Sequence, residues 1–372
     1  MRARPRLLMI GRTRYRLPLN ASLRAKFDAL AERFDLRVLA SGADGSAKRD
    51  HVFELAGPYR PRGLDGALYF LTLPFRSRRE LRRTPPDAVL VQGAHETWFV
   101  LLGRSLSGVR APVILDVHGD WRSSTRLYGS SARRLLNPVG DRIAASALRR
   151  ADAVRTISDY TTGLVRSCGV EPVAVFPAFM DLEPFLGPRA PLPTAARALF
   201  VGVLEHYKGI EELATAWPIV AEKLPRATLH LVGRGSRREA VERLVAELPD
   251  RTEWTEALPA EGVARALDAA TALVLPSRSE GMGRVLVEAF CRGRPAVASR
   301  VGGIVDLVRD GENGLLVPPR DPQALADAIY RVLADKALAD RLATGAAASA
   351  EAWVATPEEY AARLAALVAG LP

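Results

Sequence analysis

Two glutamates eight positions apart, Glu280 and Glu288, have the residue type and the surroundings of a sugar-binding site. The stretch from 277 to 288 reads S-R-S-E-G-M-G-R-V-L-V-E and follows an apolar run, 272 to 275, that predicts a buried strand. A carboxylate that accepts protons from two vicinal hydroxyls makes charge-assisted hydrogen bonds. Most such pairs are a helix cap and a solvated charge, but this position favours a pocket with one carboxylate near a sugar and the other near a ribose.

A glycine loop separates the two glutamates. Gly281 and Gly283 allow a ligand to approach the backbone closely. The amides that open the next helix are free donors at its positive end, which suits a diphosphate without a Walker lysine. The predicted donor-binding residues of this region are Arg278, Gly281, Met282, Gly283, Arg284, Val285 and Glu288.

A lysine near the end of another predicted strand can neutralise the same diphosphate. The segment from 200 to 209 reads F-V-G-V-L-E-H-Y-K-G, so Lys208 follows a strand and a short loop. A positive side chain on a leaving phosphate takes the place of a metal ion. We therefore expect Lys208 to bind phosphate oxygens, with no metal site and no cofactor.

A second glycine pair ends the predicted strand from 228 to 232, in the string L-V-G-R-G-S. Gly233 and Gly235 are predicted to pass the backbone beneath a nucleobase and are assigned to donor binding. A plain tight turn explains the pair equally well, because a lone Gly-x-Gly is weak evidence.

In the first half of the chain, the string V-I-L-D-V-H-G-D-W places His118 at the end of a predicted strand. A lone histidine is more often structural than functional. Asp120 and Trp121 either shape an acceptor site or cap and pack the next segment, and the sequence does not decide between these interpretations.

The loop after the first predicted strand reads G-R-T-R-Y-R. Gly11 is a predicted donor-binding residue because it ends that strand. Arg12, Arg14 and Arg16 are either anion contacts for a phosphorylated acceptor or solvated loop charges.

Apolar runs that alternate with helical stretches predict two parallel sheets, each covered on both faces. The runs of the first half are 7–10, 36–40, 88–91, 113–117, 153–157 and 173–176. After a proline-rich stretch, 184–193, they restart at 198–203, 228–232, 272–275, 296–299 and 315–317.

We therefore expect an α/β fold of two Rossmann-like, doubly wound domains facing a ligand-binding cleft. The predicted boundaries are 1–183 for the first domain, 184–194 for a linker and 195–345 for the second domain. Residues 346–372 are expected to be helical and to pack back on the first domain.

The composition permits two hydrophobic cores, with 372 residues of which 48% are hydrophobic. A formal charge of +10 favours an anionic partner, although an arginine-rich chain also results from a GC-rich genome. Cys168 and Cys291 suggest neither a disulfide framework nor a zinc site. The short apolar run near the N-terminus reads as a strand rather than a signal peptide, so a cytoplasmic location is expected.

One segment, 66 to 83, runs from apolar and aromatic residues into five arginines. Such a segment can lie in an anionic membrane interface, which would make the protein peripheral on the inner face of a membrane. A core helix with cations in its last turn is an equally good interpretation.

Three strings together resemble the donor-binding half of family 4 glycosyltransferases, the retaining group 1 enzymes of the GT-B fold. They are P-S-R-S-E-G-M-G-R-V-L-V-E-A-F, G-R-P-A-V-A-S-R-V-G-G-I and D-G-E-N-G-L-L-V-P-P-R-D-P. The resemblance is strong from Phe200 to about Leu333 and weaker in the first half, where H-G-D and T-I-S-D-Y carry it.

The resemblance implies retaining transfer from a nucleotide diphosphate sugar, in which the departing phosphate oxygen helps to deprotonate the acceptor hydroxyl. It makes 1–183 the acceptor-side domain and 195–345 the nucleotide-sugar domain. It implies that Lys208, Glu280 and His118 are catalytic, with Glu280 near the donor sugar and His118 on the sugar hydroxyls, and it places Glu288 on the ribose. Relatives usually carry arginine at the donor-binding position of Val203. The sequence does not decide whether Arg278, Arg284 or Arg234 replaces that cation.

We therefore predict a metal-independent hexosyltransferase that acts on a glycan or lipid-linked acceptor in bacterial envelope or exopolysaccharide synthesis. The alternatives are a non-catalytic donor-binding subunit, which Val203 suggests, and a nucleotide-sugar epimerase of the same fold. A dehydrogenase is disfavoured because G-x-G-x-x-G is absent after the first strand. Nucleic acid is not an expected partner because aromatics make up only 6% and the arginines are scattered.

Overall fold

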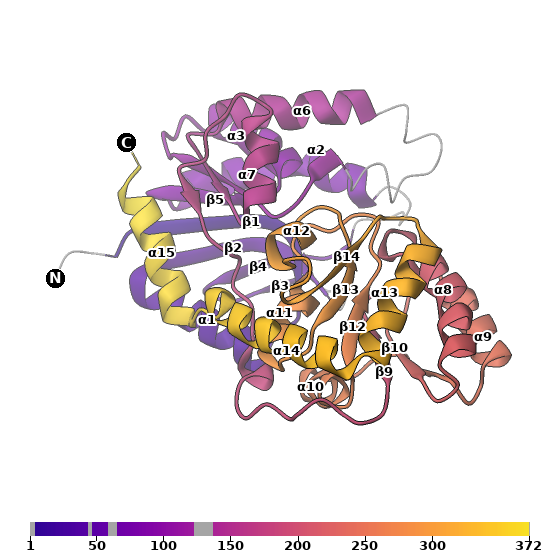
Figure 1. The fold of residues 1–372 in the computed structure, drawn as a ribbon. Helices are drawn as coiled ribbons and strands as arrows, with labels where there is room; N and C mark the ends of the chain where they lie inside the picture. The colour runs from indigo at the N-terminus through magenta and orange to yellow at the C-terminus, as the bar shows by residue number, and fades with distance from the viewer. Residues whose placement is uncertain (1–3, 44–46, 59–64, 123–136, 372) are drawn as a thin grey trace. The chain divides into compact units, whose positions relative to one another are not determined.

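The computed structural model describes residues 4–43, 47–58, 65–122 and 137–371. The chain divides into two compact units, each built on its own parallel sheet (Figure 1). The first unit is Met1–Phe179 with Ala355–Pro372, and the second is Met180–Val354. The prediction of two doubly wound α/β domains is confirmed.

The sheet of the first unit has the strand order β3-β4-β2-β1-β5-β6-β7-β8. Its strands are β1 (Arg6–Tyr15), β2 (Asp35–Gly42), β3 (Lys48–Arg49), β4 (Phe53–Ala56), β5 (Ala88–Gln92), β6 (Val113–Val117), β7 (Ala153–Thr156) and β8 (Ala174–Val175). All neighbours pair in parallel except β3 and β4. The order reverses between β1 and β5, where a doubly wound sheet opens a ligand site.

Six helices accompany this sheet within the residues that the structure describes. They are α1 (Ala21–Arg33), α2 (Asp65–Arg83), α3 (Ala94–Ser107), α6 (Asn137–Arg150), α7 (Asp159–Arg166) and α15 (Pro357–Ala369). α15 begins at a capping box formed by Thr356 and Glu359. It packs along α1, far from it in sequence, and inserts the buried Tyr360 beside Phe176 (Figure 1).

The sheet of the second unit is entirely parallel, in the order β11-β10-β9-β12-β13-β14. Its strands are β9 (Arg197–Val201), β10 (Thr228–Val232), β11 (Thr252–Thr255), β12 (Ala272–Leu275), β13 (Ala296–Ser299) and β14 (Gly314–Val317). This is the order in which two mononucleotide-binding halves meet, and the switch point lies between β9 and β12.

Helices follow most of these strands. They are α8 (Ile210–Lys223), α9 (Arg238–Glu247), α10 (Ala260–Asp268), α11 (Arg284–Cys291), α12 (Ile304–Leu307), α13 (Pro322–Ala334) and α14 (Lys336–Ala350). Three short 3-10 helices are η2 (Glu183–Phe185), η3 (His206–Lys208) and η4 (Glu351–Trp353). Asp321 and Asp335 cap α13 and α14 by accepting hydrogen bonds from backbone amides.

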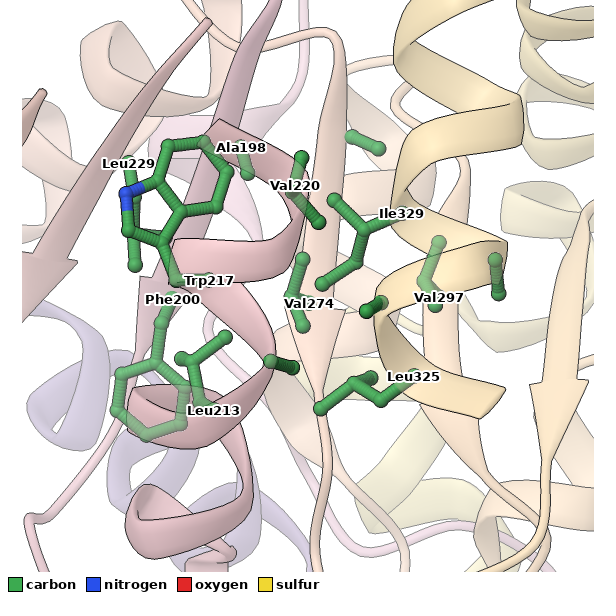
Figure 2. Close-up of a cluster of buried hydrophobic side chains, with 14 of the residues drawn as sticks. Ala198, Phe200, Leu213, Trp217, Val220, Leu229, Val274, Val297, Leu325 and Ile329 are labelled. Carbon is green, nitrogen blue, oxygen red and sulfur yellow. The ribbon is translucent and has the colours of Figure 1, made fainter. Parts of the chain in front are cut away.

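The core of the second unit lies between its sheet and the packed pair α8 and α13 (Figure 2). Trp217 of α8 is fully buried against strand residues such as Phe200 and Leu229. Val274 and Val297 meet Ile329 of α13 in the same cluster. This packing fixes β9 and β12 next to each other, and with them the loops at their carboxyl ends.

All eleven predicted strands are present, most of them within two residues of the predicted bounds, but three strands were missed. β3 has only two residues, and β4 alternates buried and half-buried residues in F-E-L-A. β11 reads T-E-W-T and lies at the edge of its sheet. β3 and β11 are edge strands and β4 lies next to an edge, so these strands bury only part of their side chains and lack the continuous apolar run that predicted the others.

Within the part of the chain that the structure describes, no helix has the length and apolar character needed to cross a membrane.

We predict that Trp217→Ala lowers the free energy of unfolding by about 3–5 kcal/mol, because the large indole leaves a cavity between α8 and the sheet. Denaturant titration followed by circular dichroism measures the loss. Trp217→Phe is the control, since it keeps a ring and removes an indole N–H that has no hydrogen-bond partner among the described residues. It should lose less than half as much; equal losses would contradict a packing role for the ring.

Candidate active site

The loops that follow β9 and β12 meet at the switch point of the second sheet. Lys208 ends η3, directly after the β9 loop, and Glu280 lies in the loop after β12. The backbone N–H of Arg278 donates to the carbonyl of Tyr207 over 2.7 Å, which ties the two loops together. Residues 72 positions apart are thereby brought to one point.

Lys208 and Glu280 form a direct ion pair. The Lys208 Nζ lies 2.5 Å from Glu280 Oε2, and both side chains are only slightly exposed. The hydroxyl of Ser277 lies 3.4 Å from the same carboxylate oxygen. A donor suited to phosphate oxygens and an acceptor suited to sugar hydroxyls are therefore held side by side.

The glycine loop between β12 and α11 lies against the backbone of a second glycine pair. A Cβ on Gly302 would lie 1.9 Å from the carbonyl oxygen of Glu280, and one on Gly303 would lie 2.1 Å from that of Gly281. The amide of Gly303 donates to the Glu280 carbonyl over 3.0 Å. The sequence alone did not predict a role for Gly302 and Gly303, which support the glycine loop through these backbone contacts.

α11 begins at Gly283, which adopts a left-handed conformation with φ of 79°. The Leu286 amide donates to the Gly283 carbonyl over 2.8 Å, and an anion at the start of this helix would meet its positive end. Met282 is buried and Val285 is half-buried, so both contribute packing to this turn.

Glu288 is buried one turn into α11. Its Oε1 accepts a hydrogen bond from Arg284 Nε over 2.7 Å. Burial raises the pKa of Glu288 above its ordinary value, while the Arg284 cation opposes the rise. Arg284 also donates to the carbonyl of Asp181 over 3.1 Å, so Glu288 is linked to the start of the second unit.

The three arginines considered as substitutes for the cation missing at Val203 have different environments. Arg278 Nε donates to the buried Glu212 over 2.7 Å, and its Nη1 contacts the ring of His206. Arg284 is paired with Glu288. Arg234 is exposed, and none of the described residues pairs with its side chain.

The β9 and β10 loops pack backbone against backbone. A Cβ on Gly233 would lie 1.8 Å from the carbonyl oxygen of Gly202, and one on Gly235 would lie 2.4 Å from that of Leu204. The Leu204 amide donates to the Arg234 carbonyl over 3.0 Å. Close backbone packing therefore explains why both positions are glycine, and it places Arg234 beside the exposed Val203.

In the first unit, Gly11 lies against Gln92 at the switch point between β1 and β5. A Cβ on Gly11 would lie 3.0 Å from Gln92 Oε1, which also accepts a hydrogen bond from the Thr13 hydroxyl over 2.8 Å. The contact with Gln92 therefore explains why this position is glycine, independently of any ligand.

A cavity of about 310 Å³ opens beside this edge, at the ends of β1, β2 and β4. Arg12 and Arg14 line it, together with Ser41, Asp65 and Tyr69. Arg12 lies 3.4 Å from Asp65 and its guanidinium lies over the ring of Tyr69. Arg14 has no pairing partner among the described residues, while Arg16 is exposed outside the cavity.

His118 is the exposed end of a charge network whose other members, Asp116 and Arg155, are buried and were not predicted from the sequence. Its Nε2 lies 2.7 Å from Asp116 Oδ2, so a neutral His118 carries its proton on Nε2 and leaves Nδ1 as an acceptor. The other oxygen of Asp116 accepts from Arg155 over 2.5 Å, and both side chains of that pair are fully buried. Burial opposes the charge, but Arg155 and His118 together lower the pKa of Asp116 to about 2.

Arg155 also contacts residues just before Phe179, where the first stretch of this unit ends. Its Nη2 donates to the carbonyls of Phe176 and Pro177, and its guanidinium lies 3.8 Å from the centre of the Phe176 ring. A charged residue inside a predicted apolar strand was the available signal. Nearby, Asp120 accepts from the Arg122 amide and Trp121 is buried in a hydrophobic cluster, so both have structural roles.

No group of three or more His, Cys, Asp or Glu side chains suited to a metal ion occurs among the residues of known placement.

Comparison with known proteins assigns both halves of the chain. The model of glycosyl transferases group 1 matches residues 195–335, and that of glycosyltransferase family 4 matches residues 22–184. The 2-deoxystreptamine glucosyltransferase of Streptomyces kanamyceticus is 31% identical over 273 residues, which cover 69% of this chain and 70% of that protein. The chain belongs to glycosyltransferase family 4.

Solved structures agree with the fold of this glycosyltransferase. Sucrose-phosphate synthase from Thermosynechococcus elongatus matches with a TM-score of 0.77 at 24% identity, covering 98% of this chain and 99% of that one. Anabaena HepE in complex with UDP matches with a TM-score of 0.72 at 18% identity, covering 98% and 100%. The prediction of a GT-B enzyme of family 4 is therefore confirmed.

Two glycines of the glycosyltransferase allow the energetic cost of a backbone clash to be measured separately from the cost of a positive φ. Gly302 and Gly311 both have positive φ, but only Gly302 meets another backbone; nothing lies within 4 Å of a Cβ on Gly311. We predict that Gly311→Ala lowers the free energy of unfolding by roughly 1–2 kcal/mol through φ alone. Gly302→Ala should lose about 1–3 kcal/mol more. Equal losses in denaturant titration would show that the loop contact is not tight.

The Asp116–Arg155 pair is tested by a double-mutant cycle in the same glycosyltransferase. Asp116→Asn and Arg155→Met should each lower the free energy of unfolding by about 3–5 kcal/mol, because each leaves its partner buried and uncompensated. The double variant should lose less than the sum. Additive losses would contradict direct pairing.

The same pair predicts a pH dependence of stability. The folded pKa of Asp116 lies below the value near 4 expected in the unfolded chain, so its contribution is fully present above pH 4 and is lost as the pH falls to about 2. Asp116→Asn should therefore flatten the acid limb of the unfolding free energy.

Proposed function

We propose that this enzyme transfers a hexose, with retention of configuration and without a metal ion, from a nucleotide diphosphate sugar to a hydroxyl. The observation that carries the proposal is the Lys208–Glu280 pair at the switch point of the second sheet. There Lys208 meets the leaving diphosphate and Glu280 accepts from sugar hydroxyls. The α11 amides complete the phosphate contact, and Glu288 takes the ribose.

Related structures support a nucleotide donor. HepE, which has the same fold, was solved in complex with UDP, and the Streptomyces relative is named as a glucosyltransferase. Since this chain has no dedicated base in the proposed site, the departing phosphate oxygen would take the acceptor proton. The protein then contributes positioning and fixed charge.

The second phosphate cation in this proposal is Arg234. Its backbone is hydrogen-bonded to Leu204, next to Val203, where relatives usually carry arginine. Of the three candidate arginines it has the side chain that no described residue engages, whereas Arg278 and Arg284 neutralise carboxylates. Arg234 therefore offers its full charge to a ligand.

For the acceptor we propose a glycan or a lipid-linked sugar of bacterial envelope or exopolysaccharide synthesis. The cavity lined by Arg12 and Arg14 lies at the switch-point end of the first sheet, where such an acceptor would bind. His118 directly follows β6 of the same sheet, two strands from β1, with Nδ1 available to a sugar hydroxyl. The enzyme would meet a lipid-linked acceptor as a cytoplasmic protein on an anionic membrane face.

A non-catalytic donor-binding subunit is the second candidate, and Val203 is the observation that favours it. Such a subunit would bind the donor without turnover. An epimerase of similar architecture would convert the donor without an acceptor.

We expect calorimetry of the metal-free protein, in the presence of a chelator, to detect binding of one uridine or guanosine diphosphate sugar. Lys208→Ala and Arg234→Ala should each weaken that binding about ten-fold or more, because each removes a charge from the phosphates. Lys223→Ala and Arg243→Ala are matched controls on the exposed surface of the same unit and should bind as the wild type does.

The two glutamates should separate binding from turnover. Glu288→Ala should weaken binding of the bare nucleoside diphosphate, whereas Glu280→Ala should leave it nearly unchanged and slow hydrolysis or transfer of the sugar. Binding that needs a divalent metal, or negligible effects of both variants, would overturn the proposed site. Donor binding with no turnover in any acceptor screen would favour the subunit.

A further inference from the structure

Four large apolar side chains protrude from two adjacent helices of the first unit. Leu71 and Phe75 of α2 are 63% and 64% exposed, and Leu102 and Leu106 of α3 are 41% and 46% exposed. We call these four residues the α2–α3 patch. Each pair is spaced four residues apart, so each forms a row along one face of its helix.

The two rows are brought together by close packing of the helices. A Cβ on Gly103 would lie 2.1 Å from the Ser77 hydroxyl, so α2 and α3 touch at a position where only glycine fits. The opposite faces are occupied, because Leu73 and Leu81 of α2 and Val100 of α3 are fully buried. The four patch residues therefore form an exposed apolar surface that is separate from the core-facing sides of the two helices.

Arginines border this patch. Arg78 Nε donates to the carbonyl of Leu106 over 3.1 Å, and Arg82 Nε donates to that of Ser107 over 3.0 Å. These bonds hold two guanidinium groups at the end of α3, directly beside Leu106. Arg76 and Arg83 add charge, and no described residue pairs with either side chain.

Acidic residues do little to neutralise this border. Between 66 and 83 the chain has five arginines and a single glutamate, Glu80. Glu80 is buried and paired with Arg37 at 3.3 Å, so it faces away from the surface. Among the described residues, Arg79 is the one arginine of this segment that pairs with carboxylates, those of Glu54 and Glu80.

We infer that the α2–α3 patch docks on an anionic phospholipid bilayer, with the four apolar side chains inserted among the lipids and the arginines on the headgroups. An apolar face bordered by arginine is the pattern of an interfacial helix. A second copy of this chain fits less well, because a two-fold interface would set the same arginines against each other. The inference rests on the proposed function in one respect, namely that this face would meet a lipid-linked acceptor.

Vesicle sedimentation tests the apolar contribution. The full chain should bind vesicles that contain phosphatidylglycerol and should bind pure phosphatidylcholine vesicles much less. Leu71→Ser with Phe75→Ser should lower the partition coefficient at least ten-fold, given the free energy of inserting two large side chains. Val173→Ser with Val305→Ser is the matched control, because both valines are exposed outside the patch. Unchanged unfolding midpoints show that both double variants are folded.

The charge contribution is tested on the same vesicles. Arg76→Gln with Arg83→Gln should weaken binding about five-fold for each arginine removed. Arg33→Gln with Arg243→Gln removes the same charge from exposed sites on other helices and should have a much smaller effect. Equal effects of the two pairs would show that vesicle binding depends on the net charge of the protein and not on this patch, and would overturn the inference.

Three other results would also overturn it: no vesicle binding at all, equal binding to neutral vesicles, or a concentration-dependent dimer that Leu71→Ser with Phe75→Ser abolishes. The last would make the patch an interface between copies. Donor calorimetry on the same preparations keeps the two proposals apart, since vesicle binding without any nucleotide-sugar binding would contradict the proposed reaction and not the docking surface.

Discussion

The site of the second unit depends on backbones that touch at the carboxyl ends of its strands. A Cβ on any of five glycines there would lie within 2.4 Å of a carbonyl oxygen: Gly209, Gly233, Gly235, Gly302 and Gly303. Because no side chain separates these loops, the β9 and β12 loops come close enough for Lys208 to reach Glu280. The same contacts leave the amides at the start of α11 without competing side chains, which suits a phosphate.

Each unit has a charge pair at the carboxyl ends of its strands, and the two pairs differ in what they contact. Asp116 and Arg155 are fully buried and tie His118 to the carbonyls that end the first unit. Lys208 and Glu280 remain slightly exposed, so a ligand can take over either partner. A fully buried pair satisfied by several hydrogen bonds fixes geometry, whereas a slightly exposed pair remains available for chemistry.

The many arginines of this chain have distinct environments. Arg155, Arg278 and Arg294 are buried or nearly so and hydrogen-bond carboxylates or carbonyls inside their units. Arg78 and Arg82 cap the end of α3 and stay at the surface. The planar guanidinium, with five donors, suits both tasks. The net charge of +10 therefore does not describe any single surface of the protein.

The sequence by itself determined the two parallel-sheet domains, their glycine loop and the candidate pair Lys208 and Glu280, because buried parallel strands are continuous apolar runs and loops at their ends are short. It did not reveal Asp116, the support from Gly302 and Gly303, or which arginine is unpaired. Those depend on contacts between segments far apart in the chain, which no local pattern records. It also left segment 66–83 open between a core helix and a membrane surface; the tertiary structure showed that α2 packs on α3 through one face and exposes Leu71 and Phe75 on the other.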